Sequence, residues 1–237
     1  MNGLIPNCID DFIFSNPHER ALLEMIMSRQ LPFPFAGKSG ILLHGTWGTG
    51  KTTLAKLLPD LIEVAHAGTW SAGQGVGQML APQSSQATFD FFGCGGGVSG
   101  AMIKQKVESK NLTMPMHHHS RHDYFIIDEI DRLTLGAQQG LRTTMNLPRC
   151  MFFCTTNNLG NLDRGIVNRC HLIEMNQATT PSAYQPVVNS VLGNMGLASS
   201  VITAPTLATM VKQARGSMRD FINAVAIEGI KQGGVLK

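Results

Sequence analysis

The 237-residue chain is 43% apolar and 15% charged, and its Lys and Arg residues exceed its Asp and Glu residues by three. This length and composition suit a globular protein with one medium domain and one small one, and the lack of any apolar stretch of bilayer length argues against a membrane protein. The weak charge excess permits a nucleic-acid partner through a local patch but does not require one.

The N-terminal residues 1–6 lack a basic segment followed by an apolar region, so we expect a cytoplasmic protein without a membrane partner. The five cysteines are odd in number and lack paired CxxC spacing, which predicts reduced thiols. Cys150 and Cys154 flank one expected strand and would lie about 13 Å apart, too far for a disulfide.

Short apolar blocks alternate with helical stretches along the first part of the chain. We expect strands at 41–43, 89–92, 124–127, 151–154 and 171–175. This alternation predicts βαβ crossovers, and therefore an α/β fold with a parallel five-stranded sheet flanked by helices and ligands at the carboxyl ends of the strands. Pro59 should end the helix after the first strand, and Thr134 should cap the helix that carries Leu141.

Residues 66–100 are rich in Gly, Ser, Gln and Ala, which indicates either a mobile surface loop or a loop that orders on a partner. After residue 177 the strand signals stop, and helices are expected at 184–195, 206–215 and 217–231. We therefore predict an α/β nucleotide-binding domain over 1–177 and a small all-helical lid domain over 178–237.

The segment GTWGTGKT at 45–52 fills every fixed position of the GxxxxGK[ST] motif and follows the first expected strand. Its glycines let the loop close around a phosphate, while the following helix presents its positive end to the anion. Lys51 should reach the β- and γ-phosphates, and the Thr52 hydroxyl should bind Mg²⁺. The candidate nucleotide-binding residues are Gly45, Thr46, Trp47, Gly48, Thr49, Gly50, Lys51, Thr52 and Thr53.

Asp128 and Glu129 follow the apolar run 124–127, so the strand delivers both carboxylates to the sheet edge beside the glycine loop. Asp128 should hold Mg²⁺, through water or through Thr52. Glu129 should orient and polarise the attacking water. In isolation these two residues would be a solvated acidic turn. The glycine loop makes the catalytic interpretation the better one.

The run of histidines in 116–122 raises the question of zinc, but adjacent histidines point in different directions. We favour a polar loop entering the next strand. A partly protonated cluster touching phosphate is the alternative.

The segment 128–134, DEIDRLT, followed by AQQGLRTTM at 137–145, resembles the DEADxxTxxAQQALRRTME segment of clamp-loader small subunits, which are AAA+ ATPases of the replication factor C type. TTNN at 155–158 looks like the family's sensor 1, on a strand between those of the glycine loop and of Asp128. Family spacing selects Asn157 rather than Asn158 to read the γ-phosphate.

The same resemblance implies roles for two arginines, Arg169 and Arg219. Asn168-Arg169-Cys170 is similar to the family's Ser-Arg-Cys, whose arginine projects into the ATP site of the neighbouring subunit; an ordinary helix-end arginine is the alternative. Gly216 to Asp220 resembles sensor 2, and the capping-box spacing of Ser217 and Asp220 places Arg219 in the first turn of a lid helix; a solvated arginine is the alternative there. Residues 9–14 resemble the stretch that contacts adenine.

The resemblance covers about residues 9–231, with departures. We expect no collar domain of the kind that holds clamp-loader rings together, since few residues follow the expected lid helices. Trp47, Asn146 and Asn168 replace a proline, a glutamate and a serine. The Gly/Ser/Gln-rich insertion is also unlike clamp loaders.

The resemblance implies a homo-oligomeric AAA+ ATPase that uses ATP and Mg²⁺ to assemble or remodel a complex of DNA and replication proteins. The minimal size fits a phage or plasmid setting. Two rivals are a helicase loader or transposition-type regulator forming filaments on DNA, and an assembly module that binds ATP without DNA. The resemblance places Lys104, Lys106 and Lys110 on a helix that faces the ring interior in clamp loaders, which is consistent with DNA binding, although a solvated helix face is the more common explanation of such lysines.

Overall fold

The computed structural model describes residues 6, 9–66, 87–112, 122–176, 178 and 180–235. The strands are β1 Gly40–His44, β2 Phe89–Gly93, β3 Asp123–Asp128, β4 Cys150–Thr156 and β5 Cys170–Glu174. The helices are α1 Pro17–Met27, α2 Lys51–His66, α3 Gly100–Leu112, α4 Leu135–Thr144, α5 Arg164–Asn168, α6 Gln185–Asn194, α7 Ala204–Ala214 and α8 Met218–Lys231.

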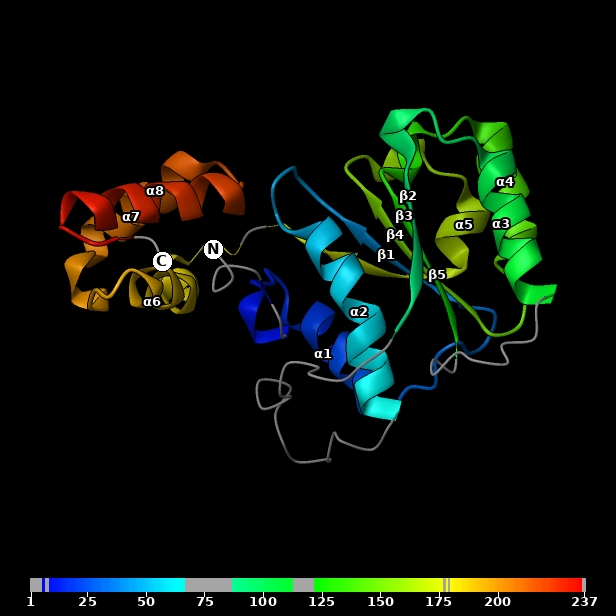
Figure 1. The fold of residues 1–237 in the computed structure, drawn as a ribbon, viewed down its shortest axis with the longest axis horizontal. Helices are drawn as coiled ribbons and strands as arrows, with labels where there is room; N and C mark the ends of the chain where they lie inside the picture. The colour runs from blue at the N-terminus through cyan, green and yellow to red at the C-terminus, as the bar shows by residue number, and fades with distance from the viewer. Residues whose placement is uncertain are drawn as a thin grey trace.

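The five strands form one parallel sheet in the order β2-β3-β4-β1-β5, with α1 and α2 on one face and α3, α4 and α5 on the other (Figure 1). Alternation along the strands divides their side chains between two cores, so Phe153 packs toward α2 while Phe152 packs toward α3 and α4. The predicted five-stranded parallel sheet is confirmed, and β4 lies between β1 and β3 as the resemblance implied.

The prediction that Pro59 ends the helix after β1 is wrong, because α2 continues through this proline to His66. A proline inside a helix removes one backbone hydrogen bond and costs about 3 kcal/mol. Leu58, Leu61 and Ile62 are nearly or fully buried against the sheet on either side of it. Their burial outweighs the local cost.

The beginning of α4 is built as expected, with Thr134 Oγ1 accepting a hydrogen bond from the backbone N–H of Ala137. The buried Gln138 on this helix donates to the Leu133 carbonyl at 3.0 Å and to the Asn161 carbonyl at 3.2 Å. Its side-chain oxygen accepts from the Asp163 N–H at 2.8 Å. One amide therefore joins α4 to the segment that leads into α5.

The C-terminal helices α6, α7 and α8 pack around a core of their own and lie together beside the sheet (Figure 1). The rings of Tyr184 and Phe221 meet there with centroids 4.9 Å apart. Each expected helix after residue 180 is present within a few residues of its predicted bounds. Ser217 caps α8 by accepting from the Asp220 N–H.

Several sequence features fall wholly or partly outside the described residues, including most of the Gly/Ser/Gln-rich insertion and the histidines at 117–119. Cys94, Cys150, Cys154 and Cys170 are buried free thiols. Burial raises the pKa of Cys94 and of Cys150 to about 12. Within the described ranges, no helix combines the length and apolar character needed to cross a bilayer.

Candidate nucleotide-binding site

The glycine loop leaves the carboxyl end of β1, which lies between β4 and β5 in the sheet. Gly45, Gly48 and Gly50 all have positive φ, a conformation that favours glycine. Space adds a second requirement at Gly48, where a Cβ would lie 2.5 Å from the Ser217 Oγ. The loop is therefore tightly wound and in direct contact with the start of α8.

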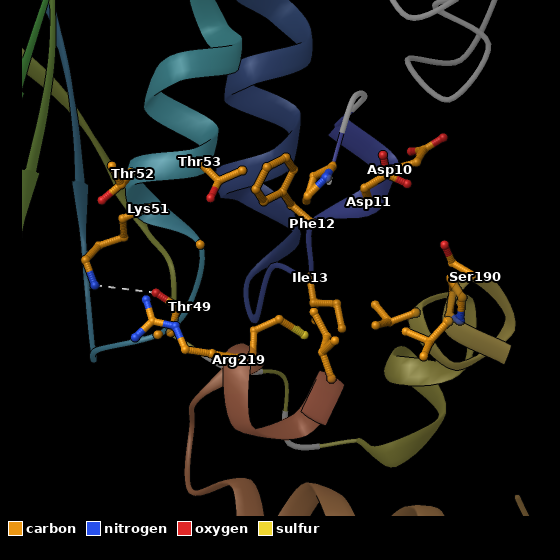
Figure 2. Close-up of a pocket in the computed structure, with 18 of the residues that line it drawn as sticks. Asp10, Asp11, Phe12, Ile13, Thr49, Lys51, Thr52, Thr53, Ser190 and Arg219 are labelled. Atoms are coloured by element: carbon orange, nitrogen blue, oxygen red, sulfur yellow. Dashed lines mark hydrogen bonds between the residues drawn. The ribbon is translucent and has the colours of Figure 1, made fainter. Parts of the chain in front are cut away.

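Lys51 is 7% exposed and folds back over its own loop. Its Nζ donates to the Gly45 carbonyl at 2.9 Å and to the Thr46 carbonyl. It also lies 3.5 Å from Thr49 Oγ1, a contact drawn as a dashed line in Figure 2. Burial lowers the pKa of Lys51, while the carboxylates after β3 act in the opposite direction. An anionic phosphate would be a stronger partner for this buried cation than neutral carbonyls are.

Asp128 joins the helix after the glycine loop to two strands. Its Oδ1 accepts from Thr52 Oγ1 and from Thr155 Oγ1, each at 2.7 Å. Thr155 in turn accepts from the Glu129 N–H at 2.9 Å, so one hydroxyl fixes both acidic residues. A hydroxyl and a carboxylate are oxygen donors of the kind that Mg²⁺ prefers, so Thr52 and Asp128 fit the predicted metal site.

Glu129 adopts a left-handed backbone conformation, with φ of 55°. Its side chain is 38% exposed, and its Oε2 lies 3.7 Å from Arg132 Nε. The same oxygen approaches the backbone at Gly95, where an added Cβ would lie 2.9 Å away. The carboxylate thus extends from the end of β3 toward the end of β2, at the carboxyl edge of the sheet. A non-glycine residue at positive φ costs about 1 kcal/mol or more and is frequent at functional sites.

Asn157 and Asn158 follow β4 at the same edge. The side chain of Asn158 accepts from the Gly160 N–H at 3.1 Å and caps a short turn. That turn occupies the Asn158 side chain, whereas Asn157 is half-buried, and its contact with the γ-phosphate stays a prediction.

The start of α8 closes one side of the site. The Met218 and Arg219 N–H groups both point to the Gly48 carbonyl, at 2.9 and 3.3 Å. The Arg219 guanidinium lies at the glycine-loop end of the pocket, where Thr49 and Lys51 also lie (Figure 2). The first turn of the lid helix, which includes Arg219 as predicted, therefore contacts the glycine loop.

A cavity of about 560 Å³ opens between the glycine loop, the N-terminal stretch and the lid helices. Phe12 and Ile13 line it from the stretch predicted to contact adenine, and Lys51 and Arg219 line it at the loop. Its apolar lid residues include Val187, Val191 and Ile222. An apolar wall beside a cationic loop suits a nucleobase at one end and phosphates at the other.

Two polar residues of the site had no predicted role. Thr155 anchors the acidic residues. Asn176 follows β5, and its Oδ1 accepts from the Thr46 N–H at 3.0 Å. Both contacts depend on neighbouring strands, since β4 pairs with β3 and β5 pairs with β1. The signal that could have found them is a polar residue at the carboxyl end of each neighbouring strand.

Arg169 lies apart from every other predicted site residue. It immediately precedes β5, whereas the glycine loop follows β1, and these strands pair in parallel with Gly40 opposite Cys170. The five residues of β1 separate the two positions by roughly 16 Å of strand. Arg169 therefore lies where the strands begin, whereas the nucleotide cavity of its own chain lies where the strands end.

The three lysines of α3 all lie near carboxylates. Lys110 is 2.9 Å and Lys106 3.7 Å from the Asp90 carboxylate, and Lys104 is 3.8 Å from Glu108. Such pairs at a surface are usually weak. This arrangement fits a solvated helix face, and a role of these lysines in DNA binding stays a prediction.

Comparison with known proteins identifies relatives of the chain. Residues 41–177 match the profile of the family described as ATPase family associated with various cellular activities (AAA). The chain is 27% identical over 191 residues to replication factor C subunit 4 of Schizosaccharomyces pombe, covering 77% of this chain and 48% of that protein. It is 26% identical over 194 residues to replication factor C subunit 4 of Oryza sativa subsp. japonica, covering 77% and 49%. The chain thus spans about half the length of these relatives.

Solved structures show the same fold. The Holliday junction branch migration motor RuvB of Thermotoga maritima superposes with a TM-score of 0.58 at 18% identity, covering 97% of this chain and 73% of that one. A DNA polymerase III gamma subunit-related protein of the same organism gives 0.52 at 12% identity, covering 91% and 60%. The sequence relatives confirm the resemblance to replication factor C small subunits, and the structures confirm the fold.

Proposed function

Since this chain belongs to the AAA family of ATPases, we propose that it hydrolyses ATP at interfaces between its own copies and so drives a clamp-loader-like change in a DNA-bound complex. The observation that carries the interfacial part is the position of Arg169. An arginine at the far edge of the sheet is out of reach of its own cavity and available to that of a neighbour.

The triphosphate would lie in the glycine loop, with Lys51 exchanging the loop carbonyls for phosphate oxygens. Thr52 and Asp128 would hold Mg²⁺, which when bound helps neutralise the charge on the β- and γ-phosphates. The nucleobase would occupy the apolar part of the cavity, beside Ile13 and Val187.

Glu129 would orient the attacking water, because phosphoryl transfer needs an in-line nucleophile more than covalent help. Thr155 fixes the backbone at Glu129, which supports this assignment. Asn157 and Arg219 would contact the γ-phosphate from the sheet and from the lid. In the transition state, Arg169 of the neighbouring copy would stabilise the charge on the transferred group.

The partner class follows from the sequence relatives. Replication factor C subunit 4 is by its name a replication protein, and this chain shares about a quarter of its residues with that subunit over most of its own length. We accordingly propose DNA and a replication protein as partners and an intracellular, cytoplasmic location.

Mixing two inactive variants tests the interfacial site. Arg169→Ala leaves the glycine loop intact, and Lys51→Ala leaves Arg169 intact. A mixed assembly therefore contains interfaces with both functional parts, about a quarter of all interfaces in a random equal mixture. We expect little ATP hydrolysis from either variant alone and partial recovery on mixing. Arg164→Ala is the matched control, at an exposed arginine that begins α5, the helix ending just before Arg169, and it should keep normal turnover.

Undiminished turnover by Arg169→Ala would reject the interfacial mechanism. Binding to primed DNA tests the partner class. Association that weakens steeply with salt supports a DNA role, whereas ATP-dependent, salt-insensitive assembly without DNA binding would support the assembly-module alternative.

A further inference from the structure

We propose that Asn146 is a positioning residue that orients the Arg169 guanidinium for the neighbouring subunit through a neutral hydrogen-bond acceptor. Asn146 follows α4 and is exposed, and no part of it enters the nucleotide cavity of its own chain. The inference depends on the proposed interfacial role of Arg169 and adds a residue to it.

The contact itself is direct. Arg169 Nε donates to Asn146 Oδ1 at 2.9 Å, and Arg169 Nη1 donates to the Gly165 carbonyl at 2.9 Å. A guanidinium has five N–H groups in a planar fork, so two bonds fix its plane and leave the other donors for a ligand. A phosphate oxygen is a ligand that those remaining donors suit.

The acceptor stands on a rigid base. The Asn146 N–H donates to the Thr143 carbonyl at 3.2 Å, and the preceding Met145 carbonyl accepts from Ser39 Oγ at 2.6 Å. The end of α4 is thereby attached to the segment entering β1. The position of the Asn146 side chain is thus set by the same elements that shape the sheet.

The backbone on either side of Arg169 is held as well. Lys38 Nζ donates to the Asn168 carbonyl at 3.2 Å and to the Cys170 carbonyl at 2.7 Å. The Arg169 carbonyl accepts from the Ser39 and Gly40 N–H groups, each at 3.0 Å. With its backbone fixed in this way, the direction of the guanidinium depends mainly on its two side-chain bonds.

The neutrality of the acceptor has a consequence for catalysis. An amide oxygen directs the guanidinium but leaves its full charge for the developing charge on the phosphoryl group. A carboxylate at the same place would form an ion pair that competes with the phosphate for the arginine. Asn146 therefore orients the Arg169 guanidinium without competing with the phosphoryl group for its charge.

A double-mutant cycle tests the inference on the assembled ATPase. Asn146→Ala should lower kcat about three- to tenfold, the effect of one lost hydrogen bond, with little change in KM for ATP. In an Arg169→Ala background the same substitution should cause no further loss, because it acts through the arginine. Asn146→Asp keeps the shape and adds charge, and it should also turn over more slowly than wild type. Thr143→Ala, at an exposed residue one turn earlier on α4, is the control and should leave turnover unchanged.

A merely structural role would not produce this pattern, because loss of folding stability affects both backgrounds alike. Undiminished turnover in Asn146→Ala, or an equal additional loss in the Arg169→Ala background, would overturn the positioning role. So would turnover at or above wild type in Asn146→Asp. Failure of the proposed function is distinguishable, because Arg169→Ala alone would then keep normal turnover.

Discussion

Replacing Thr155 with valine removes one buried hydroxyl and keeps the size and branching of the side chain. Thr155 is 2% exposed at the end of β4. Its hydroxyl donates to Asp128 Oδ1 at 2.7 Å and accepts from the Glu129 N–H at 2.9 Å. The substitution therefore takes one donor from the Asp128 carboxylate and leaves the N–H of Glu129, a residue in a left-handed conformation, without its partner.

The magnitude follows from these two bonds. A hydrogen bond to a charged group contributes about 1.5–3 kcal/mol, and a neutral one about 1 kcal/mol. The extra buried methyl group of valine offsets roughly 0.8 kcal/mol. We expect the free energy of unfolding to fall by about 2–3 kcal/mol. Turnover should fall about ten- to a hundredfold, because Asp128 and Glu129 lose their common anchor.

Urea denaturation measures the stability change, and steady-state hydrolysis with ATP binding measured separately gives the catalytic change. ATP affinity should remain within about threefold of wild type, because the glycine loop and Lys51 are untouched. Thr144→Val is the matched control, since Thr144 is equally buried but donates only to the Leu141 carbonyl of its own helix. If Thr155→Val loses less than about 1 kcal/mol and keeps turnover within twofold, Thr155 does not anchor the acidic pair.

Four further results are expected. Glu129→Gln should retain ATP binding and lose turnover by about a hundredfold or more, and hydrolysis at the normal rate would reject its role. Gly48→Ala should weaken ATP binding at least about tenfold in calorimetry, because φ is +75° and the added Cβ meets the hydroxyl that caps α8; unchanged affinity would contradict this. Cys94 and Cys150, with pKa values raised to about 12 by burial, should resist iodoacetamide at pH 8 until the chain unfolds, as mass spectrometry will show. Hydrolysis per chain should rise with protein concentration in the wild type and stay flat in Arg169→Ala; a flat wild-type curve across the range of assembly would count against the shared site.

The parts of the fold that could be predicted from the sequence are those with local signals. Four apolar residues in a row before Asp128 predict a buried strand whatever surrounds them, and the observed β3 differs from that prediction by one residue at each end. The glycine loop is similarly local, because its spacing alone determines where a phosphate can fit. The lid helices are predictable because their apolar periodicity persists over three successive segments.

Pro59 shows where local rules fail. A proline predicts a helix end because of the lost hydrogen bond and the steric conflict one turn earlier. Whether the helix ends there depends on the burial of residues such as Leu61 and Ile62, which the sheet provides. Such burial arises only when the whole domain is assembled. It therefore outweighs the helix-breaking tendency of the proline and cannot be recognised from the residues around it.

Thr155 and Asn176 were missed for a related reason. Threonine and asparagine at strand ends are common and have many uses, so neither identifies a contact. Thr155 reaches Asp128 because β4 pairs with β3 in a register that places Cys154 opposite Ile127. A shift of one residue would turn Thr155 to the other face of the sheet. The sequence can therefore suggest which residues are candidates, but the register of the strands decides which of them come into contact.

Arg169 has a predicted role in catalysis but lies far from the cavity of its own chain. The tripeptide around it predicts a catalytic arginine, and the topology places that arginine at the sheet edge opposite the cavity. Because a strand of five residues cannot be shortened without dismantling the sheet, no small movement within one copy brings the two together. The hydrogen bonds that Arg169 donates to Asn146 Oδ1 and to the Gly165 carbonyl further restrict the guanidinium to this side of the domain. The fold therefore keeps Arg169 away from the glycine loop of its own chain, and the catalytic role proposed for this arginine would have to be exercised on a neighbouring subunit.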